Sequence, residues 1–347
     1  MTFFLIFGVI ICFGVLEILS LRLPERSIHT HLEADLSLCA PEEEVALRYT
    51  VTNSSFLPLL YVGISIHFDE DVEVIPPDGA VDRWVLHKDF SGVHVEHRMH
   101  LMPYRRCSGQ IRFRIRRRGM HTIGQHYVEF GDYLGLKASV RTVEGEHRIT
   151  CTAPEWEGET ELRPLGGLMG EVSVLRFIHE DPCLLMGYRD YTGREPMKQI
   201  SWNQSAKTGR LIVKQQDHTA QANVAVLLNT EGGNRAVLER CLSLTRSICE
   251  ELEAHRIPYL FRSNGDLWDV AEGIGRSHLF PILRSLGLTR LSCYAPFAAL
   301  VDRCIREGRP DRTYIVITDE TPDALQRLQA HSEHRIVSFS GRAGEAV

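Results

Sequence analysis

Alternating apolar and polar positions dominate the chain from about residue 29 to residue 150. Residues 31–38, 45–51 and 64–68 each carry apolar side chains at every second position, and Pro, Asn, Ser and Gly interrupt the pattern between them. Short alternating strands separated by turn residues are typical of an antiparallel sandwich. The pattern predicts an all-β, Ig-like sandwich domain over residues 28–150.

One of these strands is strongly basic. Residues 111–116 alternate strictly between apolar residues and arginines, so three arginines share the outward face of the predicted strand. Together with Arg117 and Arg118 they form the basic segment Arg112–Arg118. Two interpretations are open: a solvated strand face balanced by nearby acids, or a surface for anionic lipid headgroups or an acidic partner.

The pattern changes beyond residue 222. Residues 223–229 form an apolar run of the kind buried in a parallel sheet, and residues 234–256 repeat apolar side chains at helical spacing. Further strands are predicted over 258–263, 313–318 and 335–339, and further helices over 277–286, 296–307 and 322–330. This alternation predicts a doubly wound α/β domain over residues 223–347, preceded by a connector and signature segment over 151–222.

The longest apolar run is Phe3–Leu21, close to the amino terminus. As a helix it would be ~28 Å long, which matches the hydrocarbon core of a bilayer. It predicts a transmembrane anchor over residues 1–22. Arg22 and Arg26 follow the run and no Lys or Arg precedes it, so we expect a single-pass protein of the cell membrane with most of the chain in the cytoplasm. A cleaved signal peptide is the alternative, but the basic amino-terminal region and the small-residue cleavage site are missing.

Composition and the absence of known motifs argue against several classes of function. The formal net charge of −6 argues against bulk attraction to nucleic acid, so no nucleic-acid partner is expected. Nine cysteines without a Cys-x-x-Cys pair fit reduced thiols in a cytosol. The sequence has no P-loop, no Gly-x-Ser-x-Gly elbow and no His-Glu-x-x-His helix, and no catalytic constellation is visible. We therefore expect a protein that is not an enzyme.

Histidines at every third position raise the question of a metal site. His94, His97 and His100 fall on one predicted strand, where that spacing alternates faces and cannot converge on one ion. His29 and His31 share a face but have no evident third ligand. We expect surface or partly buried histidines rather than metal ligands.

The segment from Tyr188 to Lys214 is the most distinctive part of the chain, because it combines aromatic, cationic, acidic and glycine positions. Its candidate residues are Tyr188, Arg189, Asp190, Tyr191, Glu195, Lys198, Trp202, Ser205, Lys207, Gly209 and Lys214. Three interpretations are open. The charged residues could clamp a loop through salt bridges, with Tyr188, Tyr191 and Trp202 buried beside them so that Arg189, Asp190 and Trp202 pin the segment. The aromatic and basic residues could instead dock a partner, or the acids could serve acid–base catalysis without a recognisable nucleophile.

This segment resembles the signature of the bacterial family known as "domain of unknown function 58". The resemblance runs from Tyr191 to Trp202 without a gap and extends to Arg118–Gly124 and Asp132–Leu136, so it covers about residues 53–319. Three positions depart from the family pattern: Arg194 stands where a glycine is usual, Glu195 takes the place of the turn's aspartate, and Ser201 stands where an aspartate precedes the tryptophan. The resemblance implies that the α/β domain is von Willebrand factor A-like, with a Rossmann-like fold.

In von Willebrand A domains the first strand ends in Asp-x-Ser-x-Ser, which holds a divalent cation through oxygen ligands. This chain instead has Asn229, Thr230, Glu231 and two glycines at the corresponding place. We expect a degenerate edge without a cofactor. Asn229, Glu231 and Asp319 are the candidate ligands if Mg²⁺ binds there at all.

The resemblance also implies a partner. Members of the family are commonly encoded beside MoxR-type AAA+ ATPases, so the leading hypothesis is a membrane-anchored, non-enzymatic scaffold or adaptor. It would bind such an ATPase in the assembly or maturation of envelope or other complexes. The alternatives are a divalent-metal-dependent, adhesion-type ligand-binding domain at Glu231 and Asp319, and an enzyme with its site around Arg189, Asp190 and Glu195.

Overall fold

A computed structural model describes residues 2–76, 84–89, 92–143, 147–156, 180–192, 197, 200–218, 224–232, 234–307, 312–319, 323–331 and 336–340. The chain divides into two compact units, Met1–Pro154 and Glu155–Val347. Each unit is described by itself.

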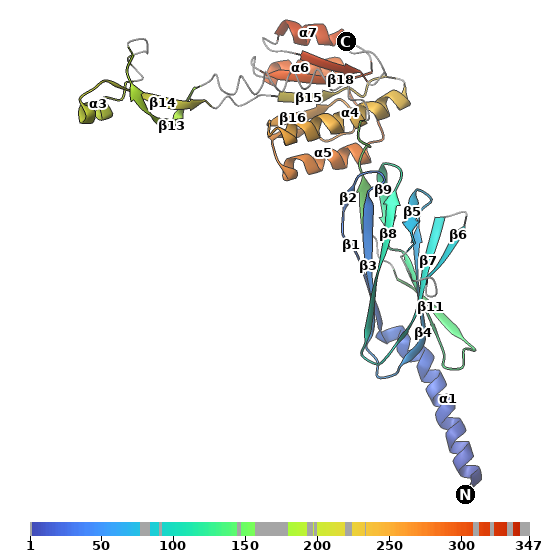
Figure 1. Ribbon diagram of the computed structural model, residues 1–347. Helices are drawn as coiled ribbons and strands as arrows, with labels where there is room; N and C mark the ends of the chain where they lie inside the picture. Colours follow the sequence, from blue (N-terminus) through green and yellow to red (C-terminus); the bar gives the residue numbers. More distant parts are fainter. Residues whose placement is uncertain are drawn as a thin grey trace. The chain divides into compact units, whose positions relative to one another are not determined.

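The first unit combines one long helix, α1 (Thr2–Ser27), with largely antiparallel sheets (Figure 1). Its strands are β1 (Ile28–Ala34), β2 (Leu38–Cys39), β3 (Glu44–Asn53), β4 (Leu59–Phe68), β5 (Val72–Ile75), β6 (Trp84–Asp89), β7 (Gly92–Leu101), β8 (Arg106–Ile115), β9 (Gly119–Ile123), β10 (His126–Gly131), β11 (Ala138–Val143) and β12 (His147–Cys151). The two large sheets have the orders β1-β3-β8-β5 and β11-β10-β4-β7-β6, and a third sheet has the order β2-β12-β9. The predicted β-sandwich is therefore present.

The period-two pattern explains the packing of this sandwich. In β8, Ile111, Phe113 and Ile115 are buried while the arginines between them point outward. They join a core that draws side chains from both large sheets, in which the rings of Phe68 and Phe113 lie 5.3 Å apart. Removing this apolar area from water is the main force that holds the sheets together.

The basic segment Arg112–Arg118 is lined with acids. Arg114 is paired with Glu44, Arg116 with Glu73 at 2.8 Å, and Arg117 with Asp71 at 3.4 Å. All these pairs are solvent-exposed, so each stabilises the fold by little. Their arrangement supports the first interpretation of the segment, a solvated strand face balanced by neighbouring carboxylates.

Helix α1 is long and apolar enough to cross a membrane, as expected from the sequence. Its apolar side chains between residues 4 and 18 are exposed, whereas its carboxyl-terminal end is bonded to the sandwich. The Arg141 guanidinium donates to the carbonyl oxygens of Glu25 (2.7 Å) and Ile28 (2.6 Å), and the Ser54 hydroxyl donates to that of Ser27 (2.8 Å). The helix is thus fixed to the domain that follows it.

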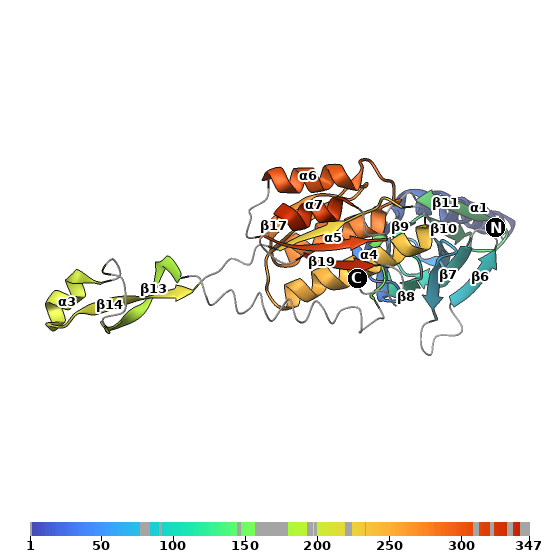
Figure 2. The same cartoon turned by 90° about the horizontal axis from the view of Figure 1, so that it is seen from above.

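The second unit contains a five-stranded sheet of order β17-β16-β15-β18-β19 with helices on both faces (Figure 2). Its strands are β15 (Val224–Leu228), β16 (Tyr259–Ser263), β17 (Val270–Gly273), β18 (Thr313–Thr318) and β19 (Ile336–Ser340), and its helices are α4 (Arg235–Ala254), α5 (Arg276–Leu288), α6 (Phe297–Glu307) and α7 (Ala324–His331). The helices α6 and α7 pack on one face, and α4 and α5 lie on the other. Every residue of β15 is buried, as expected for a strand covered on both faces.

The same unit contains a separate hairpin. It consists of β13 (Glu180–Asp190), the helix α3 (Trp202–Thr208) and β14 (Ile212–His218), with β13 and β14 paired antiparallel. The signature segment therefore contains regular structure, although its residues show no clear periodicity.

The predicted fold class, a von Willebrand A-like α/β domain preceded by a sandwich and a transmembrane helix, is wrong as a description of this chain. Most of the described strands, β1 to β12, belong to the sandwich unit. In the second sheet the edge strand β17 runs antiparallel to β16. Six residues, 264–269, separate these two strands, and a parallel crossover needs a dozen or more. Alternation of strands and helices predicts a covered sheet, but not one particular family of folds.

Individual elements were predicted more accurately than the fold class. The strand β18 has the predicted bounds, and α4, α5, α6, α7 and β19 each lie within two residues of the predicted ones. The strand β17 was missed, because four residues, none of them buried, give little periodic signal. The division into residues 1–22, 28–150, 151–222 and 223–347 stays a prediction, and residues 157–179 of the predicted connector lie outside the described residues.

Candidate functional site

Hydrogen bonds centred on two serines close the hairpin of β13, α3 and β14, which we call the signature hairpin. The backbone amide of Ile212 donates to Ser205 Oγ at 2.9 Å, and the amide of Ser201 donates to the carbonyl oxygen of Ile212 at 2.8 Å. Both serines are buried. The short helix α3 is thereby tied to the start of β14, so that the chain turns back on itself between Ser201 and Ile212.

The helix α3 ends at a glycine for a clear reason. Gly209 has φ 70°, a left-handed conformation that other residues adopt at a cost, and its amide donates to the carbonyl oxygen of Ser205 at 2.9 Å. Beneath the helix, Ile200 and Val213 are buried and form an isolated bridge between their backbones. The hairpin therefore has a small core of its own.

Large apolar side chains nevertheless remain exposed on this hairpin. Tyr188 is 44% exposed, Met197 67%, Trp202 60% and Leu211 46%. Isolated surface apolar residues are ordinary, but four within 24 residues of an otherwise hydrogen-bonded hairpin are unusual. Aromatic and sulfur-containing side chains of this kind are enriched at protein interfaces.

The structure brings some of the predicted site residues together and leaves others apart. Tyr188, Arg189 and Asp190 lie together, exposed, at the end of β13, and Tyr191 follows with its amide donating to the carbonyl oxygen of Leu211 at 2.8 Å. Lys207 is exposed on α3, and Lys214 is paired with Tyr188 in the strand register. Glu195 and Lys198 lie outside the described residues.

The expected clamp of charged residues differs from what holds the hairpin. Trp202 was predicted to pin the segment, but its indole is mostly exposed. Between residues 200 and 218, the bonds that close the turn run through Ser201 and Ser205 instead. Among the alternatives, the exposed aromatic residues favour the docking interpretation over the clamp.

A second group of polar residues lies at the carboxyl edge of the five-stranded sheet. The side-chain amide of Asn229 donates to Thr318 Oγ1 at 3.0 Å, and its oxygen accepts from the amide of Asn264 at 2.9 Å and from the backbone of Glu231 at 2.9 Å. The oxygen of Asn264 in turn accepts from the backbone amide of Thr230 at 2.8 Å. Asn229 and Asn264 join the ends of β15, β16 and β18 without any charge on either side chain.

The two acids predicted for this edge have different surroundings. Glu231 accepts a hydrogen bond from the backbone amide of Phe297 at 2.7 Å, at the first residue of α6, where a carboxylate stabilises the helix terminus. Asp319 is buried, and a Cβ placed on Gly232 would lie 3.4 Å from its carboxylate. Within the described residues, no group of three or more His, Cys, Asp or Glu side chains is arranged to hold a metal ion.

The histidines are placed apart from one another. His97 is buried and hydrogen-bonded to Tyr49 at 2.6 Å, and His94 lies 3.2 Å from His67. His100, His29 and His31 are exposed. The expected exposure is wrong for His97, because the tyrosine hydroxyl supplies the polar partner that lets an imidazole be buried.

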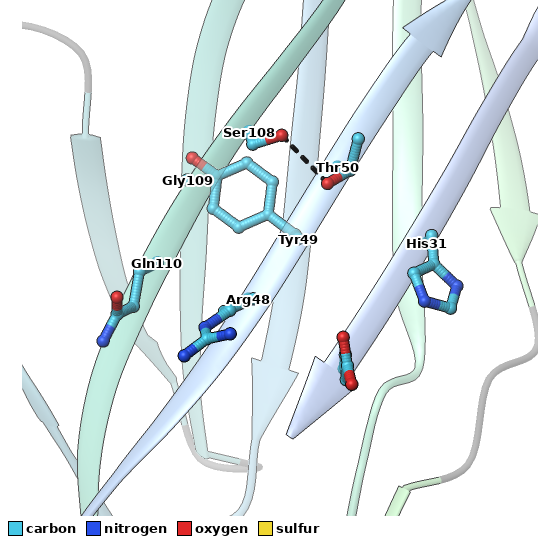
Figure 3. A pocket seen from close by; sticks show the side chains of 8 residues that line it. His31, Arg48, Tyr49, Thr50, Ser108, Gly109 and Gln110 are labelled. Carbon is cyan, nitrogen blue, oxygen red and sulfur yellow. Dashed lines mark hydrogen bonds between the residues drawn. The ribbon is translucent and has the colours of Figure 1, made fainter. Parts of the chain in front are cut away.

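A pocket of about 430 Å³ opens on the face of the β1-β3-β8 part of the sandwich (Figure 3). Its rim carries His31 and Glu33 from β1, Arg48 and Thr50 from β3, and Ser108 and Gln110 from β8. Thr50 and Ser108 are hydrogen-bonded to each other at 3.0 Å. The lining mixes one cation, one carboxylate and neutral hydroxyls.

Comparison with known proteins gives distant structural likeness only. No family model matches the chain, and no curated protein does either. A type II cohesin domain from the cellulosome of Acetivibrio cellulolyticus is 11% identical, with 35% of this chain and 95% of that chain covered and a TM-score of 0.28. CaCohA2 from Clostridium acetobutylicum is 14% identical over 37% of this chain and 93% of that chain, with a TM-score of 0.25. A CARDB domain from Pyrococcus furiosus is 8% identical over 36% and 90%, with a TM-score of 0.23.

The predominance of sandwich strands, β1 to β12, corrects the predicted fold class. The motif by which an A domain is recognised is also absent, because Asn229 and its neighbours form neutral hydrogen bonds where that motif would supply a charged carboxylate and hydroxyls.

Sequence reasoning missed several residues of both sites. Ser201 was noted only as a departure from the family pattern, and Met197 and Leu211 were not singled out. Asn264 is far from Asn229 in sequence, and only the parallel pairing of β15 with β16 brings them together. The one available signal was position, since both asparagines directly follow apolar strands whose carboxyl ends meet at one sheet edge.

Proposed function

We propose that this protein is a membrane-anchored, non-enzymatic scaffold or adaptor that binds a protein partner through the β13-α3-β14 hairpin. The observation that carries the proposal is the exposure of Tyr188, Met197, Trp202 and Leu211 on a hairpin that has its own hydrogen bonds and buried residues. A preformed surface loses little conformational entropy on binding, so its apolar area contributes effectively to affinity.

Charge supports the same assignment. Arg189, Lys207 and Arg210 are exposed beside the aromatic residues, with Asp190 as an exposed acid. Basic side chains around an apolar centre form the polar rim of many interfaces and increase the association rate with an acidic partner. The hairpin therefore suits a partner with an acidic surface.

The partner we propose is a MoxR-type AAA+ ATPase, on the basis of the resemblance to the "domain of unknown function 58" family. The process would be the assembly or maturation of envelope or other complexes. A single-pass anchor with most of the chain in the cytoplasm would place the hairpin where such an ATPase is found, and α1 has the length and apolarity that this requires.

Co-purification tests this proposal. The full-length chain, extracted in detergent from cells that express a MoxR-type ATPase beside it, is expected to retain the ATPase. Replacement of Trp202 by Ala is expected to remove it, and Thr208→Ala on the same helix serves as the matched control. Absence of the ATPase from the wild-type preparation would count against the partner.

A further inference from the structure

Three loops of the sandwich lie together at the end where α1 enters. They are residues 54–58 between β3 and β4, 102–105 between β7 and β8, and 132–137 between β10 and β11, and we call them the α1-end loops. The side-chain amide of Asn53 donates to the carbonyl oxygens of Leu57 at 2.9 Å and Met102 at 3.2 Å, which joins the first two loops. The hydroxyl of Tyr133 donates to the carbonyl oxygen of Pro58 at 2.8 Å and joins the third.

The α1-end loops are also bonded to the helix. The backbone amide of Leu134 donates to a carboxylate oxygen of Glu17 at 3.1 Å, and the backbone amide of Ser54 donates to the carbonyl oxygen of Ser27 at 2.9 Å. Figure 1 shows α1 extending from this end of the sandwich. The 132–137 loop is therefore bonded at the level of Glu17, and the 54–58 loop at the level of Ser27 at the end of the helix.

Their exposed side chains are large and apolar. Phe56 is 60% exposed, Met102 57%, Tyr104 70%, Leu134 53% and Leu136 76%. Each of the three loops contributes at least one of them. A soluble surface gains nothing from so many exposed apolar side chains at one end of a domain, whereas an interface with an apolar phase does.

The charges of the same end are mainly basic. Arg105, Arg106 and Lys137 are exposed on or beside these loops, and Arg22 and Arg26 are exposed on α1. Among the acids of this end, Glu17 accepts from Leu134 and Asp132 accepts from the amides of Leu136 and Lys137, and Glu25 is exposed on α1 between the two arginines. Apolar and aromatic side chains surrounded by arginine and lysine are the composition of a surface that lies in a lipid interface.

The height of Glu17 agrees with this assignment. Glu17 lies four residues before the end of the apolar run at Leu21, which is about 6 Å along a helix axis. A loop bonded to Glu17 would then lie near the boundary between headgroups and acyl chains. An amide donor at that depth also offsets part of the cost of placing a carboxylate there.

We propose that the α1-end loops rest in the interface of the membrane that α1 spans, with Phe56, Tyr104, Leu134 and Leu136 against acyl chains and Arg105, Arg106 and Lys137 at anionic headgroups. The sandwich is then held on the bilayer rather than tethered at a distance. The inference rests on the membrane anchor of the proposed function, but not on its partner.

The same geometry assigns the basic segment Arg112–Arg118 to the other end of the domain. Strand β8 begins at Arg106 beside the α1-end loops, and ten residues at ~3.3 Å each place Arg116 about 33 Å away along the strand. Lipid contact therefore belongs to the loops and not to that segment.

Tryptophan fluorescence in vesicles tests the proposal. The full-length chain is reconstituted into phosphatidylcholine–phosphatidylglycerol vesicles whose acyl chains carry bromine both near the headgroups and near the chain ends, because bromine quenches indole only at close approach. Three variants are compared with the parent: Leu136→Trp in the loops, Arg117→Trp at the opposite end, and Ile11→Trp within α1. All three positions are exposed, and circular dichroism checks that each variant folds.

The expected result is quenching of the added indole in the variants at positions 11 and 136, several-fold greater than at position 117. Equal quenching at positions 136 and 117, with position 11 quenched, would overturn the lipid contact and leave the anchor intact. Protection of position 136 from aqueous acrylamide without lipid quenching would show that protein covers the loops, and would also overturn it. No quenching at position 11 would overturn both the anchor and the inference.

Discussion

Tyr49 on β3 is hydrogen-bonded to His97 on β7, with 2.6 Å between the hydroxyl oxygen and Nδ1, and so links the two large sheets of the sandwich through its core. The rings meet edge to face at a centroid distance of 5.7 Å. Burial raises the pKa of the Tyr49 hydroxyl above its ordinary value, so the side chain stays neutral over a wide range of pH.

Removal of this hydroxyl should weaken the sandwich. Tyr49→Phe removes the buried hydrogen bond to His97, and we expect a loss of about 1–2 kcal/mol in the free energy of unfolding. Chemical denaturation followed by circular dichroism measures the difference. An unchanged midpoint and slope would contradict a structural role for the link.

The pKa shift gives the same pair a dependence on pH. A folded-state pKa that lies above the unfolded value makes a contribution to stability that is complete below the unfolded pKa of about 10 and is lost as pH rises above it. The stability difference between wild type and Tyr49→Phe should therefore shrink as the pH rises from about 9 to about 12, because the tyrosine of the unfolded chain ionises over this range. Denaturation curves at several alkaline pH values test this, and a constant difference would contradict it.

Gly109 is required by the position of Tyr49. The two residues are paired in the register of β3 with β8, and a Cβ on Gly109 would overlap the phenol ring and its oxygen. Gly109→Ala should therefore cost about 2 kcal/mol or more, since a packed core relaxes poorly around an added atom. The double variant Gly109→Ala, Tyr49→Leu should lose less stability than the sum of the losses in the two single variants. Additive losses would show that the clash does not occur.

Ser205 is the residue that closes the signature hairpin. Ser205→Ala leaves the amide of Ile212 without its acceptor, and we expect a loss of about 1 kcal/mol and faster hydrogen exchange at the start of β14. Thr208→Ala removes only an exposed bond to the carbonyl oxygen of Gln204 and is the matched control. Equal exchange in the two variants would refute the role of Ser205.

The sheet edge should not respond to magnesium. The side-chain amides of Asn229 and Asn264 are hydrogen-bonded to each other, and Glu231 accepts from the first residue of α6. A cation would therefore have to displace existing hydrogen bonds. We expect no heat in a calorimetric titration and no rise in melting temperature with Mg²⁺. Asn229→Asp places a charge in a buried position and should cost about 1–3 kcal/mol. Stabilisation of the wild type by Mg²⁺ would support the adhesion-type alternative instead.

The elements were largely predictable from the sequence, because their signals are local. The alternation in β8 and the helical repeat of α4 each follow from residues a few positions apart. The fold class was not predictable, since nothing near β17 indicates that it turns back beside β16. The sites were predicted only in part. Trp202 and Asn229 were singled out as residue types, whereas the exposure of Trp202 and the pairing of Asn229 with Asn264 depend on contacts between distant residues.

Binding of the partner by the hairpin is the central claim, and its affinity tests it most directly. The full-length chain in nanodiscs would be titrated with a MoxR-type ATPase expressed beside it, as wild type, as Thr208→Ala and as a Trp202→Ala, Leu211→Ser double variant. We expect wild type and Thr208→Ala to bind alike. The double variant should bind at least about 30-fold more weakly, which is the ~2 kcal/mol typical of an interface hot spot. Equal affinity for all three proteins, or no binding by the wild type, would contradict the account.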